Sequence, residues 1–224
     1  MATHLDLEEQ EQLDQIKHFW KAYGNLITWV LIALLSAYAA WNGWNWWQRG
    51  QAVKASAMFD ELDRAAQAGD ADKAGRVFGD LKERFARTAY AQQGGLLAAK
   101  VEYEKGKADA ARASLAWVAD NASEPEYQTV ARVRLAGILL DQKKYDEAGK
   151  QLDAATAKEF ESLVSDRRGD VWLAQGKKDE ARAAYQKAWQ GMDAKVGYRR
   201  WVEAKLMALG AAPAVAAAAS GVAP

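Results

Sequence analysis

Residues 22–48 carry no charged side chain, and this uncharged stretch limits the possible folds of the chain more than any other feature. Its most apolar part runs from Leu26 to Trp41. About 20 helical residues cross a ~30 Å hydrocarbon core at ~1.5 Å per residue. The stretch therefore predicts a membrane-spanning helix, which we place at residues 26–47.

Aromatic residues gather at both ends of the uncharged stretch. Tryptophan and tyrosine prefer the headgroup boundary, because an apolar ring and a polar N–H or O–H group are both satisfied there. A buried core helix or a cleavable signal peptide is the alternative, but tryptophan-rich flanks and the acidic, amphipathic segment 1–25 favour neither. We therefore expect contact with the lipid bilayer at its interfaces from Trp20, Tyr23, Trp41, Trp44, Trp46 and Trp47.

The charge distribution excludes one class of partner and leaves orientation open. Basic and acidic residues each number 30, so no net basic field would attract nucleic acid. Lys17 and Lys21 precede the uncharged stretch while Arg49, Lys54 and Arg64 follow it, which does not decide the orientation. The chain has no cysteine, so disulfides, thiolate metal sites and a cysteine nucleophile are excluded.

A fourfold repeat follows the uncharged stretch. Each repeat contains a turn rich in glycine or lysine, then an alanine, then a bulky residue four positions later. The alanines recur at intervals of 37, 37 and 33 residues. They are Ala74, Ala111, Ala148 and Ala181, the bulky residues are Phe78, Leu115, Leu152 and Tyr185, and twelve positions before the alanines lie Leu62, Ala99, Ala136 and Gly169.

We interpret each repeat as two antiparallel helices. The small residue on the first helix lets the second approach, the alanine lies at the crossing, and the bulky residue packs inside the hairpin. An aspartate before the second helix is suited to capping its exposed N–H groups. The pattern resembles the tetratricopeptide repeat, whose period is ~34 residues. The predicted fold class is therefore all-α, with a transmembrane helix followed by an α-solenoid at residues 50–208 and a disordered, alanine-rich tail at 209–224.

No pattern predicts an enzyme, a cofactor, a metal site or a small-molecule substrate. His4 and His18 are the only histidines, and no GxxxxGK[ST], HExxH or GxSxG motif occurs. Asp166 and Asp170, with the distant Glu102, are interpreted as a salt-bridged helix start rather than as paired catalytic carboxylates. The tryptophans outside the membrane region are expected in the core between repeats, at Trp117, Trp172, Trp189 and Trp201.

A helical solenoid predicts protein binding, because its stacked first helices line a groove that accepts a peptide or a helix. Ordinary solvated positions remain an equal alternative for each residue on that face. The repeat register places six residues toward the groove, namely Lys100, Tyr103, Leu140, Asp141, Asp166 and Asp170.

Three segments resemble the YfgM-type ancillary subunit of the bacterial SecYEG translocon. They are Phe19 to Asn25, Trp41 with Arg49, and the block from Val164 to Arg182. The resemblance implies a single-pass inner-membrane protein with a cytoplasmic N-terminus and a periplasmic TPR-like domain. It also implies two partners, the SecYEG translocon and a membrane-anchored periplasmic chaperone of the PpiD type, and a link to envelope-stress signalling.

Two other functions stay open beside a translocon adaptor that links the translocon to periplasmic chaperones. One is a TPR scaffold of an envelope or cell-division complex not tied to the translocon, and the other is an enzyme with an unrecognised site. The missing nucleophiles and metal ligands disfavour the enzyme. The side of the membrane that the repeats occupy separates the first two.

Overall fold

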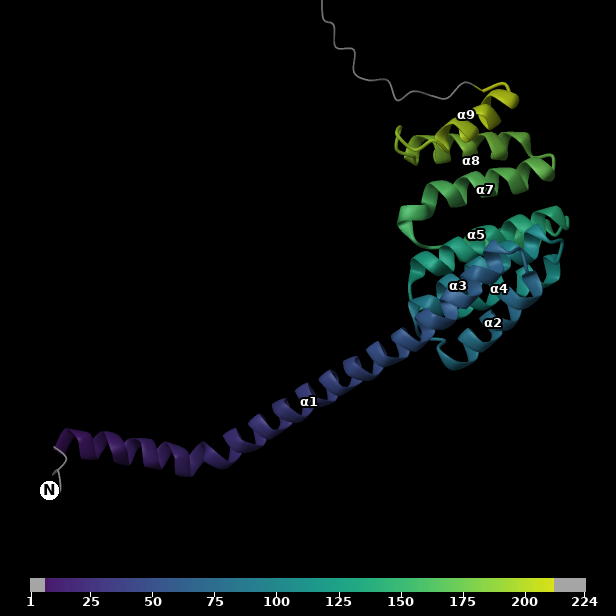
Figure 1. The fold of residues 1–224 in the computed structure, drawn as a ribbon. Coiled ribbons are helices and arrows are strands. Elements are labelled where there is room, and N and C mark those ends of the chain that lie inside the picture. The colour runs from purple at the N-terminus through teal and green to yellow at the C-terminus, as the bar shows by residue number, and fades with distance from the viewer. Residues whose placement is uncertain (1–6, 212–224) are drawn as a thin grey trace, which may run out of the picture. The chain divides into compact units, whose positions relative to one another are not determined.

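A computed structural model of the chain describes residues 7–211, so the predicted tail lies outside the described residues from position 212 onward. Two compact units meet within α1, Met1–Gln51 and Ala52–Pro224. Within residues 7–211 every regular element is helical (Figure 1). The elements are α1 (Leu7–Gln67), α2 (Ala71–Arg84), α3 (Ala89–Glu104), α4 (Ala108–Asn121), α5 (Pro125–Asp141), α6 (Tyr145–Asp153), the 3₁₀ turn η1 (Lys158–Phe160), α7 (Glu161–Ala174), α8 (Lys178–Gly191) and α9 (Arg199–Ala208).

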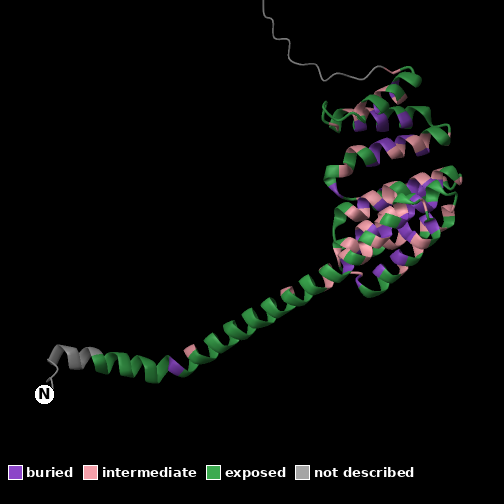
Figure 2. Cartoon of the chain, viewed as in Figure 1, coloured by how far each residue is buried: buried purple, intermediate pink, exposed green. Residues whose placement is uncertain are grey.

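The N-terminal unit is the first part of α1. From Leu13 onward, α1 contains a stretch long and apolar enough to cross a membrane, with a mean hydropathy of 1.5. Figure 2 shows this part of the helix almost entirely exposed, and Leu35 in its middle is 66% exposed. A continuous apolar surface of this kind is unfavourable in water and favourable in hydrocarbon. The unit therefore has the properties of a membrane-spanning helix.

Four helical hairpins follow in the second unit. The last part of α1 packs against α2, and then α3 pairs with α4, α5 with α6 and α7 with α8. The four hairpins share one turn geometry. The second residue after the first helix adopts a positive φ, and the N–H group of the residue that follows it donates to the carbonyl five positions earlier. Glycine occupies this position at Gly69, Gly106 and Gly176, whereas Lys143 occupies it in the third hairpin.

Burial confirms the repeat register predicted from the sequence. The crossing alanines Ala74, Ala111, Ala148 and Ala181 are all 0% exposed, and the bulky residues four positions later are at most 2% exposed. Gly169 shows why the first helix needs a small residue, since a Cβ there would lie 2.5 Å from Tyr185 Cε1. Leu62 is also fully buried, because the first hairpin accommodates a large residue where the later ones have small ones.

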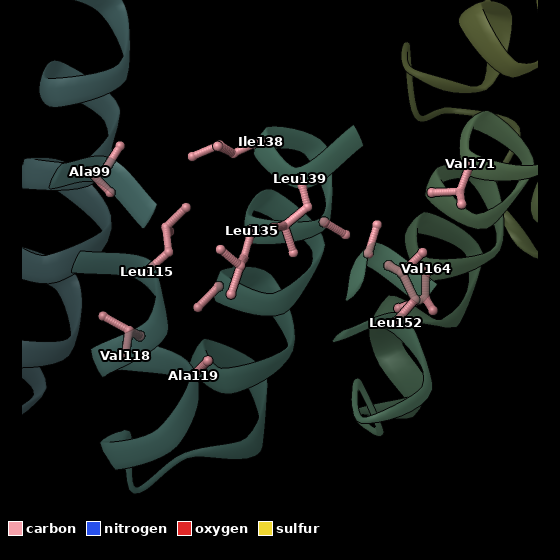
Figure 3. Packing of buried hydrophobic residues seen from close by; sticks show 14 of the residues in the cluster. Ala99, Leu115, Val118, Ala119, Leu135, Ile138, Leu139, Leu152, Val164 and Val171 are labelled. Atoms are coloured by element: carbon pink, nitrogen blue, oxygen red, sulfur yellow. The ribbon is translucent and has the colours of Figure 1, made fainter. Parts of the chain in front are cut away.

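The hairpins share three hydrophobic clusters. The first cluster joins α1, α2 and α3, the central one joins α3 to α7, and the last joins α8 to α9. Figure 3 shows the central cluster, where side chains of α4 and α5 meet those of α6 and α7. Burying one leucine in this way contributes about 1.5–3 kcal/mol. Stacking therefore stabilises helices that are too short to be stable alone.

Two expectations from the sequence require correction. Among the second helices only α2 is capped by an aspartate side chain, since Asp70 accepts from the Lys73 N–H group at 2.9 Å. The other second helices begin after a lysine and have their aspartates inside the first turn, where a negative charge still interacts favourably with the helix dipole. Trp201 is not a core residue, because it is 69% exposed on α9, behind which no further described hairpin stacks.

Candidate protein-binding site

A cavity of about 360 Å³ lies against the first helices of three successive hairpins, α3, α5 and α7. Its floor is apolar, because Ala99, Leu115 and Ile138 belong to the central core and are at most 5% exposed. Recognition sites commonly combine an apolar floor with a few well-placed polar groups. The polar walls of the cavity consist of Lys100, Tyr103, Glu104, Arg134, Asp141 and Arg167.

Tyr103 and Asp141 connect α3 to α5 across this cavity. The Tyr103 hydroxyl donates a hydrogen bond to Asp141 Oδ2. This hydrogen bond, together with burial and the carboxylate charge, raises the pKa of Tyr103. The Tyr103 side chain is nevertheless 45% exposed, so its ring is held in place and still accessible. Oriented aromatic residues of this kind are frequent anchors in protein interfaces.

Two arginines add positive charge to the same cavity. Arg134 Nη1 donates to the Leu96 carbonyl at 3.3 Å, and no carboxylate within residues 13–211 forms an ion pair with it. Arg167 Nη1 lies 3.1 Å from Asp170 Oδ2, but its buried Nε has no hydrogen-bond partner within the described chain. The Arg167 guanidinium lies over Gly137, where a Cβ would come within 3.5 Å of Arg167 Cζ.

The structure brings only some of the six predicted groove residues together. Lys100, Tyr103 and Asp141 line the cavity. Leu140 is partly buried and packs against the central core. Asp166 and Asp170 do not line the cavity and instead belong to a cluster of charged groups farther along the solenoid.

That cluster joins α7, α8 and α9, and its central cation is Lys205. Lys205 Nζ lies 2.8 Å from Asp166 Oδ1 and 2.7 Å from Asp170 Oδ1. Tyr198 donates to Asp166 at 2.7 Å and Tyr185 donates to Asp170 at 2.8 Å. Burial and these hydrogen bonds to carboxylates raise the pKa of both tyrosines. The two aspartates lie in the middle of α7 rather than at its start, so their role in the described chain is to attach α9.

Glu102 is separate from these aspartates. It is 5% exposed, and its Oε2 accepts a hydrogen bond from Ser114 Oγ at 2.8 Å. Burial raises the pKa of Glu102. Within the described residues no group of three His, Cys, Asp or Glu side chains is arranged to hold a metal ion.

Arg134 and Arg167 were not among the residues predicted to face the groove. The sequence contained a signal for Arg134, because it precedes Gly137 and Asp141 by three and seven positions and therefore shares their helical face. Arg167 belongs to the sequence block that carries the family resemblance. Its position at the cavity depends on how α7 stacks on α5. This stacking cannot be predicted from the residues of one helix alone.

The aromatic residues predicted at the membrane interfaces are all exposed on α1. Trp44 and Trp47 form a tilted pair with ring centroids 5.3 Å apart, and Tyr38 and Trp41 form another at 6.3 Å. On the other side of the apolar stretch, Tyr23 packs against Phe19 at 5.2 Å. Exposed fractions are 60% for Trp20, 53% for Tyr23, 64% for Trp41, 49% for Trp44, 78% for Trp46 and 48% for Trp47.

Helical hairpins stacked in this register define the class of tetratricopeptide-repeat proteins, and residues 17–211 match the family of tetratricopeptide repeat-like domains. The chain is 31% identical over 210 residues to the ancillary SecYEG translocon subunit of Neisseria gonorrhoeae, covering 93% of this chain and 100% of that protein. Proteins of the same name from Haemophilus influenzae and Escherichia coli are each 26% identical, over 82% and 80% of this chain and 90% and 85% of their own lengths. The chain belongs to the family of ancillary SecYEG translocon subunits.

Proposed function

We propose that this protein is a membrane-anchored, non-enzymatic adaptor of the SecYEG translocon. Its repeat domain holds a periplasmic chaperone of the PpiD type near the translocon during export or insertion of proteins. The cavity formed by α3, α5 and α7 carries this proposal, because it gives the repeat domain a recognition surface of its own. The names of the relatives from three bacteria support the translocon as the second partner.

An adaptor needs two separate contacts, and the chain offers two different surfaces. The first part of α1 presents apolar and aromatic side chains suited to the bilayer and to other membrane helices. The repeat domain presents a cavity with an apolar floor and polar walls, suited to a peptide or helix. We assign the translocon contact to the membrane helix and its aromatic flanks, and the chaperone contact to the cavity.

The proposed topology has a cytoplasmic N-terminus and a periplasmic repeat domain. Alkaline phosphatase fused after Gly210 should be active. Green fluorescent protein fused at the same position should be dark, because the general export pathway would carry it across the membrane unfolded. The reverse pattern would place the repeats in the cytoplasm. It would contradict a periplasmic partner and favour a cytoplasm-facing scaffold of an envelope complex.

Site-specific photo-crosslinking in living cells tests the two contacts separately. A photoreactive phenylalanine at Tyr103 should crosslink the chaperone, and one at Trp44 should crosslink a translocon subunit. The same group at Glu83, an exposed position on α2 outside the cavity, is the matched control. Equal chaperone crosslinking from Tyr103 and Glu83 would contradict the assignment of the cavity, and no translocon product from Trp44 would contradict the anchor.

A further inference from the structure

The charges around the cavity indicate the chemistry of its ligand. Of the two carboxylates in the wall, Glu104 lies 3.9 Å from Lys100, whereas Asp141 accepts a hydrogen bond from the neutral Tyr103 hydroxyl and keeps its negative charge. Arg134 has no ion-pair partner among the described residues, and Arg167 shares a carboxylate that Lys205 also contacts. The wall thus holds three cations, Lys100, Arg134 and Arg167, against two carboxylates, and Arg134 is the cation that lacks an ion-pair partner among the described residues.

We propose that this cavity binds a partner segment in which an acidic side chain neighbours a large apolar side chain. The carboxylate lies between Arg134 and Arg167, and the apolar side chain rests on Ala99, Leu115 and Ile138. This inference rests on the proposed function, since it specifies the chemistry of the segment that the adaptor holds. A negatively charged ligand complements the unpaired Arg134 guanidinium, and complementary charge confers specificity at interfaces.

The geometry of Arg167 favours a carboxylate over a neutral group. Its guanidinium lies beside Gly137 of α5, where an added Cβ would be 3.5 Å from Cζ and in ordinary van der Waals contact. Its Nη1 contacts Asp170 and its side chain is 32% exposed, so part of the guanidinium stays open to the cavity. A bond from an ionised donor to a carboxylate is among the strongest that a protein forms. A ligand carboxylate would form such a bond with the exposed part of the Arg167 guanidinium.

We assign the carboxylate to an internal Asp or Glu rather than to a chain terminus. The three cations of the wall come from the first helices of three successive hairpins, with Lys100 on α3, Arg134 on α5 and Arg167 on α7. A segment that crosses these helices meets one cation after another and continues beyond the last. Side chains of an internal segment match this distribution better than a single terminal group.

A peptide selection on the full-length chain tests the inference. The protein is placed in nanodiscs of zwitterionic lipid, and random dodecapeptides are displayed on phage with their C-termini fused to the coat protein. Selected peptides should be enriched in Asp or Glu beside Leu, Ile or Phe. A synthetic, fluorescent peptide of the consensus with an amidated C-terminus then provides affinities by anisotropy.

Paired changes in protein and peptide identify the contact. Arg134→Gln and the Glu→Gln change in the peptide should each weaken binding about tenfold, because each removes a charge-assisted interaction. Combining them should weaken binding little more than either alone, since both remove the same interaction. Arg134→Lys should retain part of the affinity, and Arg87→Gln, at an exposed position outside the cavity, should leave it unchanged.

Several outcomes would overturn the inference. One is a peptide consensus without acidic residues. Another is equal affinity of Arg134→Gln and the unchanged protein for the consensus peptide, when both melt at the same temperature by circular dichroism. A third is much tighter binding of a peptide with a free C-terminal carboxylate than of the amidated peptide with its internal one. These outcomes leave the proposed function standing if Tyr103 still crosslinks the chaperone. Failure of that crosslink contradicts the proposed function whichever peptides are selected.

Discussion

Lys143 has a left-handed backbone conformation, with φ at 59°, in the turn where the other three hairpins have glycine. A side chain in this conformation brings Cβ close to a carbonyl oxygen and costs about 1–2 kcal/mol, part of which the greater freedom of glycine in the unfolded chain offsets. Lys143→Gly should therefore raise the free energy of unfolding by about 0.5–1 kcal/mol in urea denaturation. The reverse change at the equivalent turn, Gly106→Lys, should lower it by a similar amount.

The turn geometry would be contradicted if Lys143→Gly destabilised the protein. The hydrogen bond from the Lys144 N–H group to the Leu139 carbonyl, 2.8 Å, does not involve the Lys143 side chain and should survive the change. The stabilisation should thus appear without altered far-ultraviolet circular dichroism.

Glu102 makes stability depend on pH. Its pKa is raised in the folded protein by burial, although Ser114 donates to it and Lys107 and Lys82 favour its charged form. A raised pKa means that the folded state binds the proton of Glu102 more tightly than the unfolded chain does. The fold therefore loses stability as pH rises through the pKa of Glu102 in the unfolded chain and then through its higher pKa in the folded protein. Glu102→Gln, which keeps an acceptor for Ser114, should raise the melting temperature at pH 7.

The same substitution should have little effect at about pH 3.5, below the ordinary pKa of a glutamate, because Glu102 is then protonated in both states. Glu83→Gln is the matched control, since Glu83 is an exposed carboxylate on α2. A larger gain from Glu102→Gln in acid than at neutral pH would contradict the assigned cause of the shift, which is burial.

At the scale of helices, α9 closes the C-terminal end of the described repeat array. Val202 and Leu206 of α9 are 0% exposed against α8, and Lys205 reaches the two aspartates of α7. The outer face of α9 instead exposes Trp201 and Met207. Terminal helices of solenoids commonly cover the last hydrophobic surface in this way.

Lys205 should therefore matter more than an ordinary surface lysine. Lys205→Met leaves Asp166, which is 2% exposed, and the neighbouring Asp170 without their central cation. Removing one partner of a buried ion pair costs about 3–5 kcal/mol, and we expect the lower end because Lys205 itself is 29% exposed. Hydrogen exchange should show lost protection in α9 before the central hairpins.

Lys187→Met is the control for this prediction. Lys187 forms a short ion pair with Glu161, at 2.7 Å, but the two side chains are 63% and 60% exposed. Solvent screens such an exposed pair, so Lys187→Met should cost much less stability than Lys205→Met. Similar losses from the two lysine variants would show that the Lys205 cluster behaves as a surface ion pair and does not hold α9.

For the whole molecule, we propose that the repeat domain folds without the membrane helix. Removing residues 1–48 eliminates the exposed apolar part of α1 and retains Ala55 and Leu62, which are 0% exposed and belong to the first cluster. The truncated protein should be soluble, monodisperse and helical by circular dichroism. An insoluble or unfolded product would show that the repeats need the membrane unit.

A longer truncation checks where the repeat domain begins. Removing residues 1–66 also eliminates Leu62, which packs with Phe78 and Leu81 of α2. Losing a buried leucine costs about 2–5 kcal/mol, so this protein should melt at a clearly lower temperature than the one lacking residues 1–48. Equal melting temperatures would contradict the inclusion of α1 in the first hairpin.

The sequence predicted the helical fold, the apolar membrane helix and the register of the repeats. These features are local, since a charge-free stretch and an alanine followed by a bulky residue four positions later are read within one helix. Ala148 and Leu152 illustrate this, because their burial follows from their spacing. The pattern did not show that α9 ends the described array, which is why Trp201 was wrongly expected in the core.

The tertiary structure alone decided which charged groups meet. Lys205 contacts Asp166 and Asp170 across 39 and 35 residues of sequence. Arg134 and Arg167 come to one cavity because α7 stacks on α5. The four hairpins share one local pattern, so the sequence leaves open which polar side chains face each other once they stack. Hairpin packing determines that choice, and with it the positive charge of the cavity.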